Sequence, residues 1–143
     1  MSFNVMIVDD SNAMRGVIKK IISMSGFKMD KCLEAGNGKE AMTLLEDNWV
    51  DVIISDINMP VMSGLEMLSH LKKDDLFGDI PVIMITTEGS STRMEEAFQH
   101  GARGFIKKPF LPEDLKKILN EVLGVCDDGG YGEIEGDDND LDF

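Results

Sequence analysis

Cysteine and long hydrophobic runs are scarce in this sequence, and each scarcity argues against a class of protein. The two cysteines, Cys32 and Cys126, lack CxxC spacing, so they indicate neither a disulfide framework nor a zinc site. No apolar run approaches the length that crosses a membrane, and two acids directly follow the first apolar run, which argues against a signal peptide. We therefore expect a cytoplasmic protein in a reducing compartment, with no membrane insertion.

Basic residues are also few, because the 143 residues include 27 acids and only 14 lysines and arginines, a net charge of −13. This balance argues against a nucleic-acid-binding surface. Eight of the acids lie in residues 125–143, which contain four glycines and no basic residue. The rest of the chain, with 19 acids and 14 basic residues, has the charge of an ordinary folded domain. We predict one domain over residues 1–124 and an acidic, disordered segment over residues 125–143.

Strand and helix patterns alternate five times along residues 1–124. Short runs rich in Val and Ile predict buried strands, and segments with apolar residues at helical spacing follow them. The predicted strands are 5–8, 27–33, 51–55, 81–86 and 103–107, and the predicted helices include 63–73, 90–100 and a last helix that begins at Pro112. This alternation predicts an α/β fold with a parallel sheet and helices on both faces.

The stretch VDVIISDINMPVMSG, residues 50–64, combines a buried strand, an acidic loop and a helix start. Asp56 stands where the strand ends, Pro60 favours a turn, and Ser63 is suited to cap the following helix. A carboxylate at the end of a buried strand is costly unless something binds it. In open α/β sheets ligands bind at this edge, although the alternative that Asp56 only caps a loop stays open.

Two further acids, Asp9 and Asp10, follow the first predicted strand. If the sheet has the doubly wound order 2-1-3-4-5, the first and third strands are neighbours and these acids converge with Asp56. Three clustered carboxylates repel one another, and a hard divalent cation such as Mg²⁺ relieves the repulsion. The backbone carbonyl of Asn58 is well placed to complete the ligands.

The fourth and fifth predicted strands end in a hydroxyl, on Thr86, and a cation, on Lys108. Acids, a metal, a hydroxyl and a lysine at one sheet edge suit phosphoryl transfer to a carboxylate nucleophile, which needs positioning and charge neutralisation. The loop after the first strand has no glycine-rich phosphate cradle, which argues against a nucleotide or flavin site. Thr86 as an ordinary strand residue and Lys108 as a solvated one remain the structural alternatives.

These residues resemble the receiver domain of two-component response regulators, of the stand-alone chemotaxis (CheY-like) type. The stretches that carry the resemblance are VMIVDDS, DVIISDINMPVMSGLEML, PVIMITT and GARGFIKKPF. The resemblance implies a flavodoxin-like or CheY-like fold, with five parallel strands in the order 2-1-3-4-5 flanked by five helices. It implies these site residues: Asp56 as phosphoacceptor; Asp9, Asp10, Asp56 and the Asn58 carbonyl as Mg²⁺ ligands; Thr86 and Lys108 as partners of the phosphoryl group.

The resemblance also implies how the signal leaves the site. Phe105 matches the aromatic switch position, which turns inward when Thr86 moves, and the Lys108–Pro109 peptide bond would be cis. A sensor histidine kinase would phosphorylate Asp56, and a target would dock on the fourth helix, fifth strand and fifth helix. We expect a chemotaxis pathway, a monomer, removal of the phosphoryl group by autodephosphorylation or a phosphatase, and no turnover catalysis.

Two other functions compete with the binding switch. A phosphorelay intermediate would pass its phosphoryl group to a histidine phosphotransfer protein. An enzyme of the haloacid-dehalogenase kind would need a second Asp two residues after its nucleophile, and Asn58 occupies that position, which weighs against turnover.

The acidic segment carries spaced apolar residues, namely Tyr131, Ile134, Leu141 and Phe143. Acids interleaved with aromatics are typical of a segment that docks on a basic, partly apolar surface. Lys107, Lys116 and Lys117 on the output side could supply that surface. The alternative, a solvated extension that only aids solubility, stays open.

Overall fold

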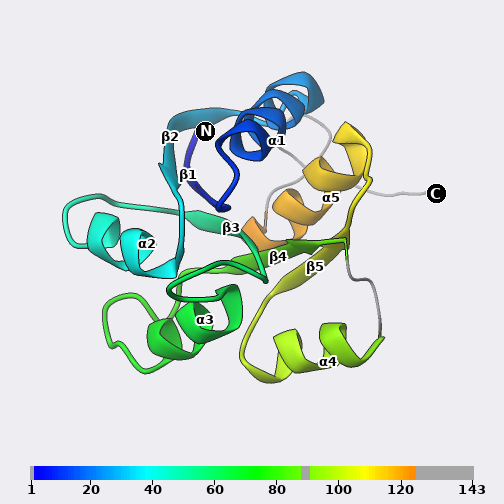
Figure 1. The fold of residues 1–143 in the computed structure, drawn as a ribbon. Coiled ribbons are helices and arrows are strands. Elements are labelled where there is room, and N and C mark those ends of the chain that lie inside the picture. The colour runs from blue at the N-terminus through cyan, green and yellow to red at the C-terminus, as the bar shows by residue number, and fades with distance from the viewer. Residues whose placement is uncertain (1, 88–90, 125–143) are drawn as a thin grey trace.

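The computed structural model describes residues 2–87 and 91–124 of the chain. Five strands form one parallel sheet in the order β2-β1-β3-β4-β5, and a helix follows each strand (Figure 1). The bounds are β1 Phe3–Val8, α1 Asn12–Ser25, β2 Met29–Ala35, α2 Gly38–Leu45, β3 Val52–Asp56, α3 Gly64–Lys72, β4 Val82–Thr86, α4 Ser91–Gln99, β5 Gly104–Lys107 and α5 Pro112–Leu123. The predicted fold class and strand order are confirmed.

The strand β2 begins two residues later than the sequence predicts. It pairs with β1, with Phe3 opposite Met29 and Val8 opposite Ala35. Phe27 precedes the strand, and its buried ring stacks on Phe3 with 5.6 Å between the ring centroids. An edge strand has a weak hydrophobic pattern of its own, so pairing with β1 determines where β2 begins and ends.

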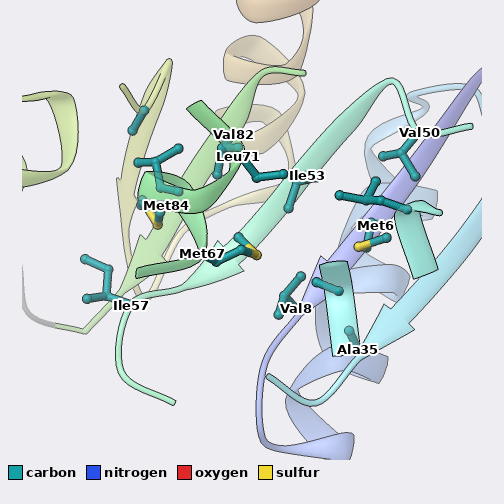
Figure 2. Close-up of a cluster of buried hydrophobic side chains, with 14 of the residues drawn as sticks. Met6, Val8, Ala35, Val50, Ile53, Ile57, Met67, Leu71, Val82 and Met84 are labelled. Carbon is teal, nitrogen blue, oxygen red and sulfur yellow. The ribbon is translucent and has the colours of Figure 1, made fainter. Parts of the chain in front are cut away.

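Two hydrophobic layers cover the faces of the sheet. Met6 and Val8 of β1 lie in the layer beneath α2, α3 and α4, whereas Val5 and Ile7 lie in the layer beneath α1 and α5. Figure 2 shows the first layer, to which strand and helix side chains both contribute. Successive strand residues point to opposite faces, so strands buried on both faces need the continuous apolar runs seen in the sequence. Among the described residues, no helix is long and apolar enough to cross a membrane.

Side-chain caps begin the helices next to the carboxyl ends of the strands. The Ser11 hydroxyl accepts a hydrogen bond from the Met14 N–H at 3.1 Å, where α1 begins. At α3, the Ser63 hydroxyl accepts from the Glu66 N–H at 3.2 Å and the Glu66 carboxylate accepts from the Ser63 N–H at 3.0 Å. The predicted Ser63 cap is confirmed, and this reciprocal pair holds the loop after β3 in one conformation.

We predict that Gly16→Ala stabilises the protein. Gly16 lies inside α1, its φ is not positive, and an added Cβ would meet nothing within 4 Å. Glycine within a helix costs about 0.5–1 kcal/mol relative to alanine, chiefly because the unfolded chain is more flexible. Urea denaturation should therefore show a higher midpoint with an unchanged slope. An unchanged or lower midpoint would mean that Gly16 has a structural role that its surroundings do not show.

Candidate functional site

Three carboxylates meet at the edge of the sheet where the strands end. β1 and β3 are hydrogen-bonded neighbours, with Val8 opposite Ser55, so the acids that end them lie side by side. One carboxylate oxygen from each of Asp9, Asp10 and Asp56 lies within 4.8 Å of the others. The structure therefore brings together the acids that the sequence places at separate strand ends.

Asp9 is the buried member of this cluster, at 2% exposure. Its Oδ1 accepts a hydrogen bond from the Ser11 N–H at 2.9 Å. Its Oδ2 is buried without a hydrogen-bond partner among the described residues, and the Lys108 Nζ lies 3.6 Å from it. A buried carboxylate oxygen that lacks a hydrogen bond is costly, so beside its ion pair with Lys108 this atom can still take a further ligand such as a metal ion.

The Asp56 carboxylate is partly buried at the end of β3. Its Oδ1 accepts a hydrogen bond from the Ile57 N–H at 2.8 Å. Burial raises the pKa of Asp56, the Lys108 charge lowers it, and the charges of Asp9 and Asp10 raise it further. The net shift is upward, because burial and the charges of Asp9 and Asp10 outweigh the Lys108 charge and the Ile57 N–H, so the ionised form of Asp56 is disfavoured.

The loop after Asp56 closes tightly over the end of β3. The Gly64 N–H donates to the Ile57 carbonyl at 2.8 Å, and an added Cβ on Gly64 would lie 2.2 Å from the Asp56 carbonyl oxygen. Only glycine permits this approach, so Gly64 is a positioning residue for Asp56. Our sequence reasoning missed it, although a glycine directly after a helix cap was a usable signal.

Thr86 and Lys108 lie beside the acids, at the ends of the neighbouring strands. Thr86 ends β4 at 1% exposure, and its carbonyl accepts a hydrogen bond from the Lys108 N–H at 2.8 Å. The Lys108–Pro109 peptide bond is cis. The predicted hydroxyl and cation thus reach the same edge as the acids, because parallel strands end together there.

Asn58 lies in the loop after β3, whereas Phe105 lies within β5. Asn58 lies two residues after Asp56, beyond the end of β3, and is exposed. Phe105 lies on β5, opposite Met84 of β4, and its half-buried ring packs against the layer beneath α2, α3 and α4. Its predicted role as a switch stays a prediction.

Comparison with known proteins identifies the family. A model of the response regulator receiver domain matches residues 5–120. A chemotaxis protein CheY homolog from Campylobacter jejuni is 41% identical over 130 residues, which cover 90% of this chain and 98% of that protein. The chain belongs to the response regulator receiver domain family. The predicted resemblance to CheY-like receivers is thereby confirmed.

Solved receiver structures agree with the fold of this receiver. The chemotaxis response regulator CheY4 of Vibrio cholerae is 36% identical, with a TM-score of 0.76, and the match covers 86% of this chain and 100% of CheY4. The receiver domain of a sensor histidine kinase from Pseudomonas aeruginosa has a TM-score of 0.76 at 22% identity, over 87% of this chain and 99% of that one. That structure holds a magnesium ion in its active site cleft.

Proposed function

We propose that this receiver is a phosphorylation-controlled binding switch of a chemotaxis pathway. The observation that carries the proposal is the position of Asp56, which lies within one cluster with two further acids, beside a half-buried lysine and a buried threonine. A sensor histidine kinase in the cytoplasm would be the phosphoryl donor, and a phosphatase could shorten the signal. The similarity to chemotaxis proteins along most of the chain supports this pathway.

The donor atoms in the cluster suit Mg²⁺. All three side chains offer carboxylate oxygens, and the Asp9 Oδ2 lacks a hydrogen bond among the described residues. Mg²⁺ binds hard oxygen ligands and takes only one or two carboxylates directly, so it leaves room for water and a phosphate oxygen. Asp9, Asp10, Asp56 and the carbonyl of Asn58 would hold the ion, some of them directly and the others through its bound water. When bound, it would neutralise charge that develops on the transferred phosphoryl group.

Asp56, Lys108 and Thr86 would carry out the phosphoryl transfer itself. A carboxylate oxygen of Asp56 would form a bond to phosphorus while the bond from phosphorus to the histidine nitrogen of the kinase breaks. The distance from the Lys108 Nζ to the Asp9 Oδ2 is 3.6 Å, which is too long for a strong hydrogen bond. The Lys108 ammonium can therefore turn to pair with the phosphoryl oxygens. The Thr86 hydroxyl would donate a hydrogen bond to the same group.

Thr86 connects the site to the output side. Lys107 of β5 lies opposite Thr86, and Phe105 lies two residues earlier on the same strand. Phe105 is a phenylalanine, so no hydroxyl can form a hydrogen bond when the ring turns inward. The neighbouring helix α4 exposes Met94 and Phe98, at 39% and 46%. A target would dock on this face of α4, β5 and α5, where exposed apolar side chains lie one helical turn apart.

We propose a switch and not a turnover enzyme, because an asparagine follows Asp56 at the second position and an amide cannot serve as a general acid. Intact-mass spectrometry after incubation with acetyl phosphate tests the proposal. We expect one phosphoryl group per chain with Mg²⁺, none with EDTA, and spontaneous loss after the donor is removed. Continuous hydrolysis of the donor at enzyme rates, without an observable adduct, would contradict a switch.

We predict that the acid cluster lowers stability at neutral pH without Mg²⁺. The pKa of Asp56 is higher in the folded protein than in the unfolded chain, so the folded protein binds the carboxyl proton more tightly. The folded state therefore loses stability as the pH rises from the unfolded-state pKa to the folded-state pKa. Asp56→Asn should therefore raise the unfolding midpoint at pH 7, and the difference should shrink towards acidic pH, where both states hold the proton.

Adding Mg²⁺ should make wild type more stable than Asp56→Asn, the reverse of their order without the ion. A ligand at 100 times its dissociation constant stabilises the folded state by about 2.7 kcal/mol, and wild type should gain more than Asp56→Asn. Thermal unfolding with and without Mg²⁺ measures both effects. If wild type is the more stable protein without Mg²⁺ at pH 7, burial and the neighbouring acids do not destabilise ionised Asp56.

A further inference from the structure

A groove of about 410 Å³ separates the end of α1 from the first half of α5. Its lining residues are Met24, Ser25, Pro112, Glu113, Lys116 and Lys117. We call it the α1–α5 groove. It lies against the helix that leads directly into residues 125–143, and the two helices are neighbours on one face of the sheet (Figure 1).

The α1–α5 groove combines positive charge with an exposed apolar side chain. Lys116 turns toward the end of α1, because its Nζ lies 3.7 Å from where a Cβ on Gly26 would be. Lys117 is exposed beside it, and Met24 is 66% exposed. Glu113 is the one acid among the lining residues, and α1 contains Arg15, Lys19 and Lys20 and no acid.

Two other grooves on the described surface have more acidic than basic lining residues. One is lined by residues of α2 and the loop after β3, including Glu34, Glu40 and a single lysine, Lys39. The other surrounds the exposed Trp49 and Leu76 and is lined by Asp47 without any basic residue. Of the three, only the α1–α5 groove has more basic than acidic lining residues.

We propose that the acidic segment, residues 125–143, docks in the α1–α5 groove of its own chain. The segment brings eight carboxylates and no basic residue, together with the apolar side chains of Tyr131, Ile134, Leu141 and Phe143. Carboxylates would pair with Lys116 and Lys117, and an apolar side chain would cover Met24. This location differs from the surface near Lys107 that the sequence suggested, because Lys107 does not line the groove.

The covalent connection makes this contact feasible. From Lys117 to Gly124 α5 rises roughly 10 Å, at 1.5 Å per residue. The seven residues from Gly124 to Tyr131 can span roughly 23–25 Å, which is enough to return to the groove. Tethering gives an effective concentration on the order of millimolar, so a contact too weak for separate molecules is still populated. This inference does not depend on phosphorylation of Asp56.

Paramagnetic relaxation in the full chain tests the proposal. A nitroxide is attached at Asn139→Cys, in a background with Cys32→Ala and Cys126→Ala, and the amide spectrum is recorded at low and high salt. We expect the amides of Met24–Gly26 and of residues 113–117 to lose more than roughly half of their intensity at low salt. At about 1 M salt the screening length falls to roughly 3 Å, and the intensity should return.

Charge reversal supplies the matched comparison. Lys116→Glu with Lys117→Glu should abolish the broadening, whereas Lys39→Glu with Lys73→Glu, the same charge change at exposed lysines outside the groove, should preserve it. If the reversed variant does not fold, Lys116→Gln with Lys117→Gln replaces it.

Three results would overturn the proposal. The first is broadening centred on Trp49 and Leu76 or on α4. The second is no localised broadening at low salt. The third is broadening of an isotope-labelled, nitroxide-free chain when it is mixed with a nitroxide-labelled, isotope-free chain, which would place the contact between copies.

Discussion

Asp56→Asn is expected to reduce phosphoryl acceptance from acetyl phosphate by more than about 10³-fold, because removal of a covalent nucleophile typically costs at least that much. The amide has no charged oxygen to attack phosphorus, and the other two acids cannot substitute for it. Asp9 is buried with its Oδ1 engaged by the Ser11 N–H, and Asp10 follows β1 and not β3. Intact-mass spectrometry after incubation with acetyl phosphate and Mg²⁺ measures the loss.

A matched control is Asp75→Asn, the same change at an exposed acid outside the cluster, which should accept a phosphoryl group like wild type. Asp10→Asn separates metal binding from phosphoryl acceptance. This variant should still accept a phosphoryl group at saturating Mg²⁺, but it should need a higher Mg²⁺ concentration than wild type. A stable phosphoryl adduct on Asp56→Asn, mapped to another residue, would move the acceptor elsewhere.

Gly64→Ala is expected to destabilise the protein by about 3 kcal/mol or more, at the upper end of the range for overpacking a filled site. The new Cβ would lie 2.2 Å from the Asp56 carbonyl oxygen and 3.1 Å from the Ile57 Cα. Both contacts are with backbone, so a side chain cannot turn away to relieve them. The end of β3 and the loop after it must move, and Asp56 moves with them. Urea denaturation measures the loss.

The same substitution at Gly16 has the opposite predicted sign, which separates the effect of the close approach from the effect of alanine in a helix. Phosphoryl acceptance by Gly64→Ala should also fall, under conditions where the variant remains folded. Equal stability of Gly64→Ala and wild type would show that the loop can relax, and Gly64 would not position Asp56.

Much of the fold was predictable because the strands are buried on both faces. β3 begins with the apolar run Val52, Ile53 and Ile54, and β4 is apolar from Val82 to Ile85, so their place in the sheet is visible in the sequence. The edge strand β2 exposes several of its residues and contains charged ones, and its bounds follow from pairing with β1. That information lies in the partner strand and not in the segment itself.

The composition of the site was predictable for a related reason. In a parallel sheet, chemically distinctive residues at successive strand ends must meet, so Asp9, Asp56, Thr86 and Lys108 could be assigned to one edge. Two features could not be predicted: that the Asp9 Oδ2 has no hydrogen-bond partner within residues 2–87 and 91–124, and that Gly64 closely approaches Asp56. Both depend on distances between atoms of different segments. Glu113, Lys116 and Met24 form a groove only once α1 and α5 are packed together.

In the proposed switch, a phosphoryl group on Asp56 changes the face formed by α4, β5 and α5. Amide spectra of the full chain with Mg²⁺ alone, and then with Mg²⁺ and beryllofluoride as a phosphoryl analogue, test this change most directly. We predict saturable shifts at Thr86 and Phe105 and on the exposed side of α4 at Met94 and Phe98, all absent in Asp56→Asn. Shifts confined to Asp9, Asp10 and Asp56 and to the residues next to them in the chain would show binding without switching, and would contradict the account.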